Sequence, residues 1–166
     1  MADEKEFIEL INKNKGIIYK ICTTYSNNKD DKDDLAQDIV FNLWKSYGSY
    51  NKEYKFSTWM YRIALNVAIS FYRQGKKSKL KDSFSERLIV FEEGLDKKIE
   101  EDKNLEMLHD FINGLKEIDK AIILLYLEDK PYREMAEITG FTETNIATRI
   151  NRIKEKLRQN FKTNNH

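Results

Sequence analysis

The sequence has few of the residues that build disulfide frameworks, metal sites and sheets. Its one cysteine, Cys22, has no second cysteine to bridge, and its two histidines, His109 and His166, form no cluster with metal-ligand spacing. One proline and six glycines leave long stretches without a helix breaker, and the composition favours helices over sheet. We therefore expect an all-α protein with no metal or other cofactor.

Long apolar runs are also missing, and so is the basic and apolar start of a signal peptide. These absences predict a cytoplasmic protein without membrane insertion. Neither histidine has a nearby nucleophile or paired carboxylate, and no glycine-rich loop could cradle a phosphate. We therefore expect a protein that is not an enzyme and has no small-molecule substrate.

Apolar residues recur at helical spacing between Lys55 and Arg73 and predict an amphipathic helix. Its predicted buried stripe comprises Phe56, Met60, Ile63, Ala64, Val67 and Phe71. Tyr61, Leu65 and Tyr72 lie opposite, so the helix is apolar on two flanks, as in a helix shared between a core and a partner. The polar strip between the flanks comprises Thr58, Arg62, Asn66 and Arg73, with Trp59 at its edge. Such groups bind phosphates and stack on exposed bases, although a solvated helix face carries similar residues.

Two further helical stretches precede this helix. The first runs from about Asp3 to Tyr25 with an interruption near residues 14–16, and the second follows a polar turn at 26–34, capped by Asp33 and Asp34. The predicted inner face of the second comprises Leu35, Ile39 or Val40, Leu43 and Tyr47. Its outer face comprises Asp34, Gln37, Asp38, Asn42 and Lys45, with Phe41 near the margin. This outer face is either solvated or a docking surface for another protein.

Residues 75–97 have no sustained period and are rich in charge, which is typical of a linker. The sequence thus predicts a helical domain over 1–74, a flexible linker over 75–97 and a second helical domain over 98–166. Leu88–Phe91 forms an apolar patch within the linker. This patch either docks on a flanking bundle or binds a partner.

The second domain begins with helices predicted over 99–115 and 118–129, the latter capped by Asp119, and its most specific stretch is 131–159. Pro131 suits a first helical turn or the residue before one. Ala136, Gly140 and Ile146 then meet three steric demands of a helix-turn-helix: a close helix crossing, a left-handed turn and an apolar plug.

The second helix of this motif is predicted to carry a recognition face. Thr142 is a good N-cap, and Ile146, Ile150, Ile153 and Leu157 continue the buried stripe. The opposite face comprises Thr144, Asn145, Thr148, Asn151 and Arg152, with Arg149 and Lys156 beside it. Arginine can pair with guanine and asparagine with adenine in the major groove. Charge supports this face, because residues 101–141 carry five basic and ten acidic side chains and residues 142–166 carry six basic and two acidic ones.

Both halves of the chain resemble one family, the extracytoplasmic-function (ECF) sigma factors of the sigma-70 family. DLAQDIVFNLWKSY is similar to the family's D-x-x-Q-[DE]-x-x-x-x-x-W motif, and FSTWMYRIALNVAISFYR resembles its F-x-x-W-[LM]-x-x-I-A-x-N-x-A-[IL]-x-x-x-R helix. PYREMAEITGFTETNIATRINRIKEKLR resembles region 4 of the same family. Leu65 and Ser70 depart from the basic and acidic residues of many relatives, and Ala147 replaces a frequent lysine.

The resemblance implies a transcription initiation factor that binds core RNA polymerase and promoter DNA, and an anti-sigma factor is a further conceivable partner. Polymerase would be bound through the predicted helix that follows the polar turn at 26–34, with the residues Asp34, Gln37, Asp38, Phe41 and Asn42. The promoter −10 element would be read and opened by Tyr50, Asn51, Tyr54, Thr58, Trp59, Arg62, Asn66 and Arg73. The −35 element would be read by Thr142, Thr144, Asn145, Thr148, Arg149, Asn151 and Arg152.

Linker length predicts dependence on polymerase. About 22 flexible residues have a typical end-to-end distance of roughly 25 Å and a limit of about 75 Å. Two promoter elements two helical turns apart lie roughly 70 Å from each other. The linker must be nearly taut on DNA, so we expect weak promoter binding by the chain alone. The alternative is a conventional helix-turn-helix regulator with an N-terminal sensing or dimerisation bundle.

Overall fold

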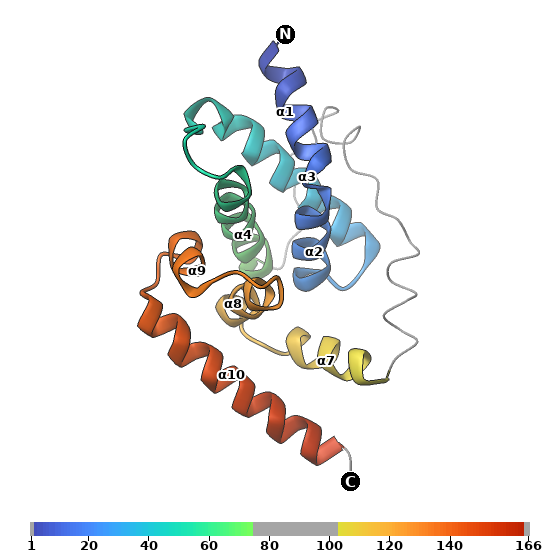
Figure 1. Cartoon of the computed structure of the whole chain (residues 1–166). Coiled ribbons are helices and arrows are strands. Elements are labelled where there is room, and N and C mark those ends of the chain that lie inside the picture. The colour runs from blue at the N-terminus through green and yellow to red at the C-terminus, as the bar shows by residue number, and fades with distance from the viewer. Residues whose placement is uncertain (1, 75–102, 165–166) are drawn as a thin grey trace. The chain divides into compact units, whose positions relative to one another are not determined.

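The computed structural model describes residues 2–74 and 103–164, and every regular element in these two ranges is a helix (Figure 1). The chain divides into two compact units. Unit 1 here denotes residues 2–74, and unit 2 denotes residues 103–164. The all-α prediction is confirmed, while the predicted linker and its Leu88–Phe91 patch lie outside the described residues.

Unit 1 begins with two short helices, α1 (Ala2–Lys13) and α2 (Lys15–Tyr25). They are separated at Asn14, whose side-chain amide donates to the Leu10 carbonyl at 2.8 Å. The predicted interruption near residue 14 is therefore confirmed.

The next helix, α3 (Lys29–Ser46), starts earlier than predicted, and Asp33 and Asp34 are not its caps. Asn28 has extended backbone geometry, and its side-chain oxygen accepts from the Asp31 backbone N–H at 2.8 Å. Asn28 is thus the N-cap, and Asp30 and Asp31 in the first turn complement the helix dipole. Residues 29–34 bury no apolar side chain, so this first part of the helix has no hydrophobic period by which the sequence could predict it.

A single 3₁₀ turn, η1 (Tyr47–Ser49), and a loop lead to the long helix α4 (Phe56–Gln74). Helices α2, α3 and α4 pack against one another, and Leu35, Ile39, Val40 and Leu43 of α3 are fully buried as predicted. On α4 the predicted stripe was partly wrong, since the buried residues are Met60, Tyr61, Ala64, Leu65 and Ala68. Phe56, Ile63, Val67 and Phe71 are only half-buried. The small side chains of Ala64 and Ala68, one turn apart, allow neighbouring helices to approach closely, which a count of large apolar residues does not register.

Unit 2 comprises α7 (Lys103–Asn113), α8 (Glu117–Leu127), α9 (Tyr132–Thr139) and α10 (Glu143–Asn164). Helix α8 is buried along most of its length, including Lys120, whose Nζ donates to the Asn113 carbonyl at 3.0 Å at the end of α7. Burial lowers the pKa of Lys120. The predicted cap Asp119 is wrong, because Lys116 occupies the N-cap position and Asp119 lies within the first turn.

Helices α9 and α10 form the predicted helix-turn-helix. Pro131 immediately precedes α9, and Gly140 ends it with a φ of 84°, a left-handed value that glycine adopts without steric cost. The Thr142 hydroxyl accepts from the Asn145 backbone N–H at 3.0 Å and so caps α10. Ile146, Ile150 and Ile153 are buried, which turns the opposite face of α10 outward.

Candidate nucleic-acid interface

The polar strip of α4 lies on the surface of unit 1. Arg62, Asn66 and Arg73 are exposed, and Thr58 and Trp59 are half-buried at the start of the helix. Residues 58, 62 and 66 follow one another at one-turn intervals, so their side chains share one side of the helix. The strip therefore offers cationic and amide groups along one line.

Next to the strip, aromatic rings from two elements form a cluster. The Tyr50 ring lies 5.0 Å from the Trp59 ring and 5.4 Å from the Phe56 ring, measured between centroids, and Tyr47 stacks on Tyr50 at 6.2 Å. Two of these rings, Tyr47 and Phe56, were not among the predicted site residues. Phe56 opens the F-x-x-W motif and Tyr47 lies on the predicted inner face of the preceding helix, but the packing of these rings depends on the loop between η1 and α4, which the sequence did not reveal.

The loop itself is a tight polar turn with one exposed ring. The Tyr50 hydroxyl donates to the Tyr54 carbonyl at 2.6 Å, and the Asn51 side-chain oxygen accepts from the Glu53 backbone N–H at 3.0 Å. Tyr54 itself is 69% exposed. Of the three loop residues predicted to contact DNA, Tyr50 is packed, Asn51 shapes the turn and Tyr54 is open to a ligand.

Helix α1 also contacts this loop, which the sequence did not predict. Glu6 forms an ion pair with Lys52 at 3.0 Å, and the Phe7 ring lies 5.1 Å from both the Trp44 and Tyr47 rings. The hydrogen bond with Lys52 lowers the pKa of Glu6, and the same bond raises the pKa of Lys52. Helix α1 is therefore part of the support of the loop.

The predicted polymerase-binding residues lie on one helix but are less open than expected. Asp34, Gln37, Asp38, Phe41 and Asn42 are all half-buried on α3. The Asn42 side-chain amide donates to the Asp38 carbonyl at 2.8 Å, one turn back along the helix. These residues form a mixed polar and aromatic surface within a regular helix, and their role stays a prediction.

The outer face of α10 agrees with the predicted recognition face for most of its residues. Thr144, Asn145, Thr148, Asn151 and Arg152 are exposed, as is the cap Thr142. The Thr148 hydroxyl donates to the Thr144 carbonyl at 3.0 Å. The face thus presents amide, hydroxyl and guanidinium groups from successive turns of one helix.

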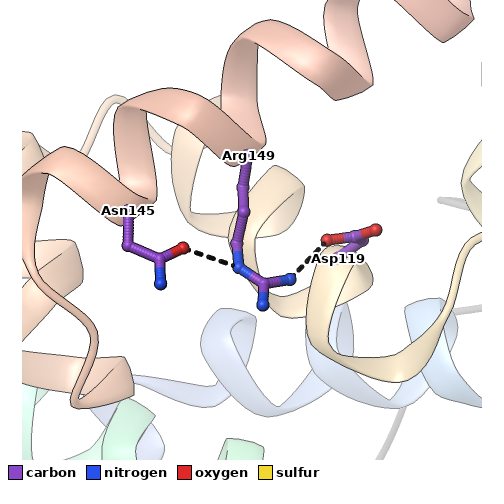
Figure 2. Close-up of polar contacts among 3 residues, drawn as sticks. All are labelled: Asp119, Asn145 and Arg149. Carbon is purple, nitrogen blue, oxygen red and sulfur yellow. Dashed lines mark hydrogen bonds and ion pairs between the residues drawn. The ribbon is translucent and has the colours of Figure 1, made fainter.

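Arg149 differs from these residues because it is half-buried and bound by three neighbours. Its Nε donates to Asn145 Oδ1 at 2.9 Å, and its Nη1 bonds Asp119 Oδ1 at 3.3 Å (Figure 2). The guanidinium carbon lies 4.8 Å from the centre of the Phe141 ring. A second cation of α10, Lys154, lies 4.6 Å from the centre of the Tyr126 ring on α8, and its hydrogen bond with Tyr126 raises its pKa. Two of the α10 cations are thus turned inward toward α8.

Comparison with known proteins identifies the class to which these two units belong. Residues 10–78 match the family Sigma-70 region 2, and residues 105–157 match Sigma-70, region 4. Together these matches define a two-part initiation factor of the sigma-70 type. A helix-turn-helix regulator with an unrelated sensing bundle does not account for the match over 10–78.

Similar proteins place the chain within that class. It is 28% identical to the ECF RNA polymerase sigma factor SigW of Bacillus subtilis (strain 168), over 95% of this chain and 90% of SigW. It is 29% identical to the RNA polymerase sigma factor SigV of the same organism, over 91% of this chain and 88% of SigV. The fold resembles that in the structure of CnrH in complex with the cytosolic domain of CnrY, with a TM-score of 0.69, 18% identity and coverage of 96% of this chain and 89% of CnrH.

The chain belongs to the extracytoplasmic-function sigma factors of the sigma-70 family. It is a transcription initiation factor that binds core RNA polymerase and promoter DNA, and its family is not a family of enzymes. Within residues 2–74 and 103–164, no helix is both long and apolar enough to cross a membrane.

Proposed function

We propose that the two units divide promoter recognition, with unit 1 opening the −10 element and unit 2 reading the −35 element. The observation that carries the proposal is the α4 surface, where exposed Arg62 and Asn66 follow Trp59 and its aromatic cluster. Guanidinium and amide groups beside aromatic rings suit a single strand better than a closed duplex. The proposal places this work in the cytoplasm, without catalysis by the chain itself.

The energetics of strand opening agree with this surface. Extruding a base from the duplex costs a few kcal/mol, and stacking on an aromatic side chain returns roughly 1 to 3 kcal/mol per base. Tyr54 is the open ring of the loop, and Trp59 lies at the edge of the strip. Each base that an aromatic side chain captures therefore recovers much of the cost of its own extrusion.

Unit 1 would meet polymerase through α3. We assign this contact to the half-buried surface made by Asp34, Gln37, Asp38, Phe41 and Asn42. Such a surface offers an aromatic ring for the buried centre of an interface and polar groups for its rim. By analogy with CnrH, which is seen in complex with the cytosolic domain of CnrY, an inhibitory protein partner of this chain is a further proposal.

Unit 2 would enter the major groove with α10. Base and phosphate contacts are supported by the exposed face of α10, which comprises Thr144, Asn145, Thr148, Asn151 and Arg152. The N-cap Thr142 is also exposed, so the N-terminus of α10 is open to a phosphate. On a promoter, the predicted linker between the units would have to be nearly taut. We therefore expect tight specific binding only when polymerase fixes both units on one promoter.

Two assays with the full chain and core polymerase test the division. Holoenzyme carrying Arg62→Ala and Asn66→Ala should bind a single-stranded −10 oligonucleotide about tenfold more weakly, yet retain binding to an upstream duplex with the −35 element. Lys13→Ala, which removes an exposed positive charge from the same unit, is the matched control. Equal losses on both ligands, or a gel shift showing tight specific binding without polymerase, would contradict the proposal.

A further inference from the structure

In unit 2 an ion pair joins α8 to the recognition helix α10, and the proposed function gives this pair no role. Arg149 Nη1 lies 3.3 Å from Asp119 Oδ1, and the two side chains are only 27% and 14% exposed. Water and salt screen such a sheltered pair less than they screen an exposed one. Asp119 therefore holds the guanidinium in place from a helix outside the recognition face.

The held guanidinium in turn fixes the orientation of the Asn145 amide. Arg149 Nε–H can only donate, so the Asn145 atom that faces it at 2.9 Å is the carbonyl oxygen. The NH₂ group of Asn145 must then point elsewhere. Figure 2 shows this NH₂ group and the second terminal nitrogen of Arg149 on the same side of the network.

We propose that Asp119 is a specificity-determining residue for the −35 element, acting through Arg149 on Asn145. It is a positioning residue, because it holds the side chain that orients the reading group. The inference rests on the proposed role of unit 2 in reading this element. Without Asp119, the guanidinium loses its anchor on α8 and the Asn145 amide can rotate.

The orientation has a consequence for which base is favoured. An asparagine reads adenine by accepting from N6 and donating to N7 at the same time. One of the two lone pairs of Oδ1 is already engaged by Arg149, which weakens Oδ1 as an acceptor for adenine N6. Asn145 then offers its NH₂ group as a donor, and Arg149 offers another donor beside it. Two donors match guanine, whose major-groove edge has two acceptors, O6 and N7. The network thus favours guanine over adenine at the base pair facing Asn145.

The test measures how tightly holoenzyme binds a set of promoters in which each upstream base pair is varied singly. The holoenzyme is reconstituted from the full chain and core RNA polymerase. Asn145→Ala identifies the base pair that this residue reads. Asp119→Ala should lower the preference for guanine over adenine at that same base pair about tenfold, as expected when one well-placed contact is lost. Asp119→Asn retains an acceptor oxygen and should show a smaller loss. Overall binding should not weaken, because a released Arg149 can contact phosphate.

Glu155→Ala is the matched control. It removes one negative charge and an ion pair, that of Arg158 Nη1 with Glu155 Oε2 at 2.7 Å, but this pair joins two residues of α10 itself. Glu155→Ala should leave every base preference unchanged. Thermal unfolding of each variant separates loss of fold from loss of reading.

The inference is overturned if Asp119→Ala weakens all promoters by one factor, or relaxes a base pair other than the one Asn145 reads. A different result would reject the proposed function itself: wild-type holoenzyme with no base preference anywhere in the upstream element. The first pattern leaves unit 2 as a reader of DNA, and the second does not.

Discussion

The candidate DNA-binding surfaces of unit 1 and unit 2 differ in their chemistry. The candidate surface of unit 1 combines packed aromatic rings with a short polar strip on α4, whereas that of unit 2 is a single helix face of amides, hydroxyls and guanidiniums. Rings stack on bases that have left the duplex, and amides and guanidiniums read base edges and phosphates of a closed duplex. On the proposed division of promoter recognition, this contrast would let one small chain act on both states of DNA.

The two surfaces also differ in how they are supported. In unit 1 the loop is held from outside by α1, through Glu6 and Phe7. In unit 2 the recognition helix is held by its buried isoleucines and by the contacts of Arg149 and Lys154 with α8. The first surface depends on a loop and the second on a rigid helix, and the following variants test this difference.

The largest expected effect is on the support of the recognition helix. Ile146→Ala removes a fully buried side chain and should destabilise unit 2 by about 2–5 kcal/mol. Both tryptophans, Trp44 and Trp59, lie in unit 1, so the loss should appear in far-UV circular dichroism and leave tryptophan fluorescence unchanged. Leu157→Ala, at a half-buried position of the same stripe, should cost less. A matching shift in fluorescence would show that the two units unfold together.

A second pair of variants compares stacking with charge. Tyr54→Ala should weaken binding of single-stranded −10 DNA by holoenzyme by about 1–3 kcal/mol with little change in salt dependence, because an uncharged ring is lost. Arg152→Ala should instead lower the slope of log affinity against log salt by about 1 on upstream duplex DNA. Binding isotherms at several salt concentrations give both values. The contrast between the units fails if the two variants change the salt slope equally.

The smallest effect concerns the tie between α1 and the loop. Glu6 has its pKa lowered below the ordinary 4.5 in the folded state, so its ion pair with Lys52 stabilises unit 1 above that pH. This stabilisation disappears as pH falls through the lower folded value. Glu6→Gln should therefore slightly lower the melting temperature at pH 7, by tryptophan fluorescence, and the difference should vanish in acid. Glu9→Gln, on the same helix, is the control, and a loss that persists in acid would point to packing instead of charge.

The sequence was sufficient for the features that depend on local rules. Helical spacing predicted α4 and α10, and the left-handed Gly140 and the cap Thr142 followed from residue type alone. The buried side of α4 was partly mispredicted because it has apolar residues on two flanks, and only the neighbouring helices decide which flank is buried. The ion pairs of Asp119 with Arg149 and of Glu6 with Lys52 join residues far apart in sequence, so no spacing rule could find them.

The early start of α3 has a consequence for docking. With 18 residues the helix is roughly 27 Å long, and the surface from Asp34 to Asn42 lies in its middle, away from either fraying end. A surface in the middle of a regular helix has already lost its backbone freedom before any partner arrives. On the proposed docking through α3, polymerase would bind a helix that is already formed, so the free-energy cost of ordering a segment on contact would not reduce the affinity.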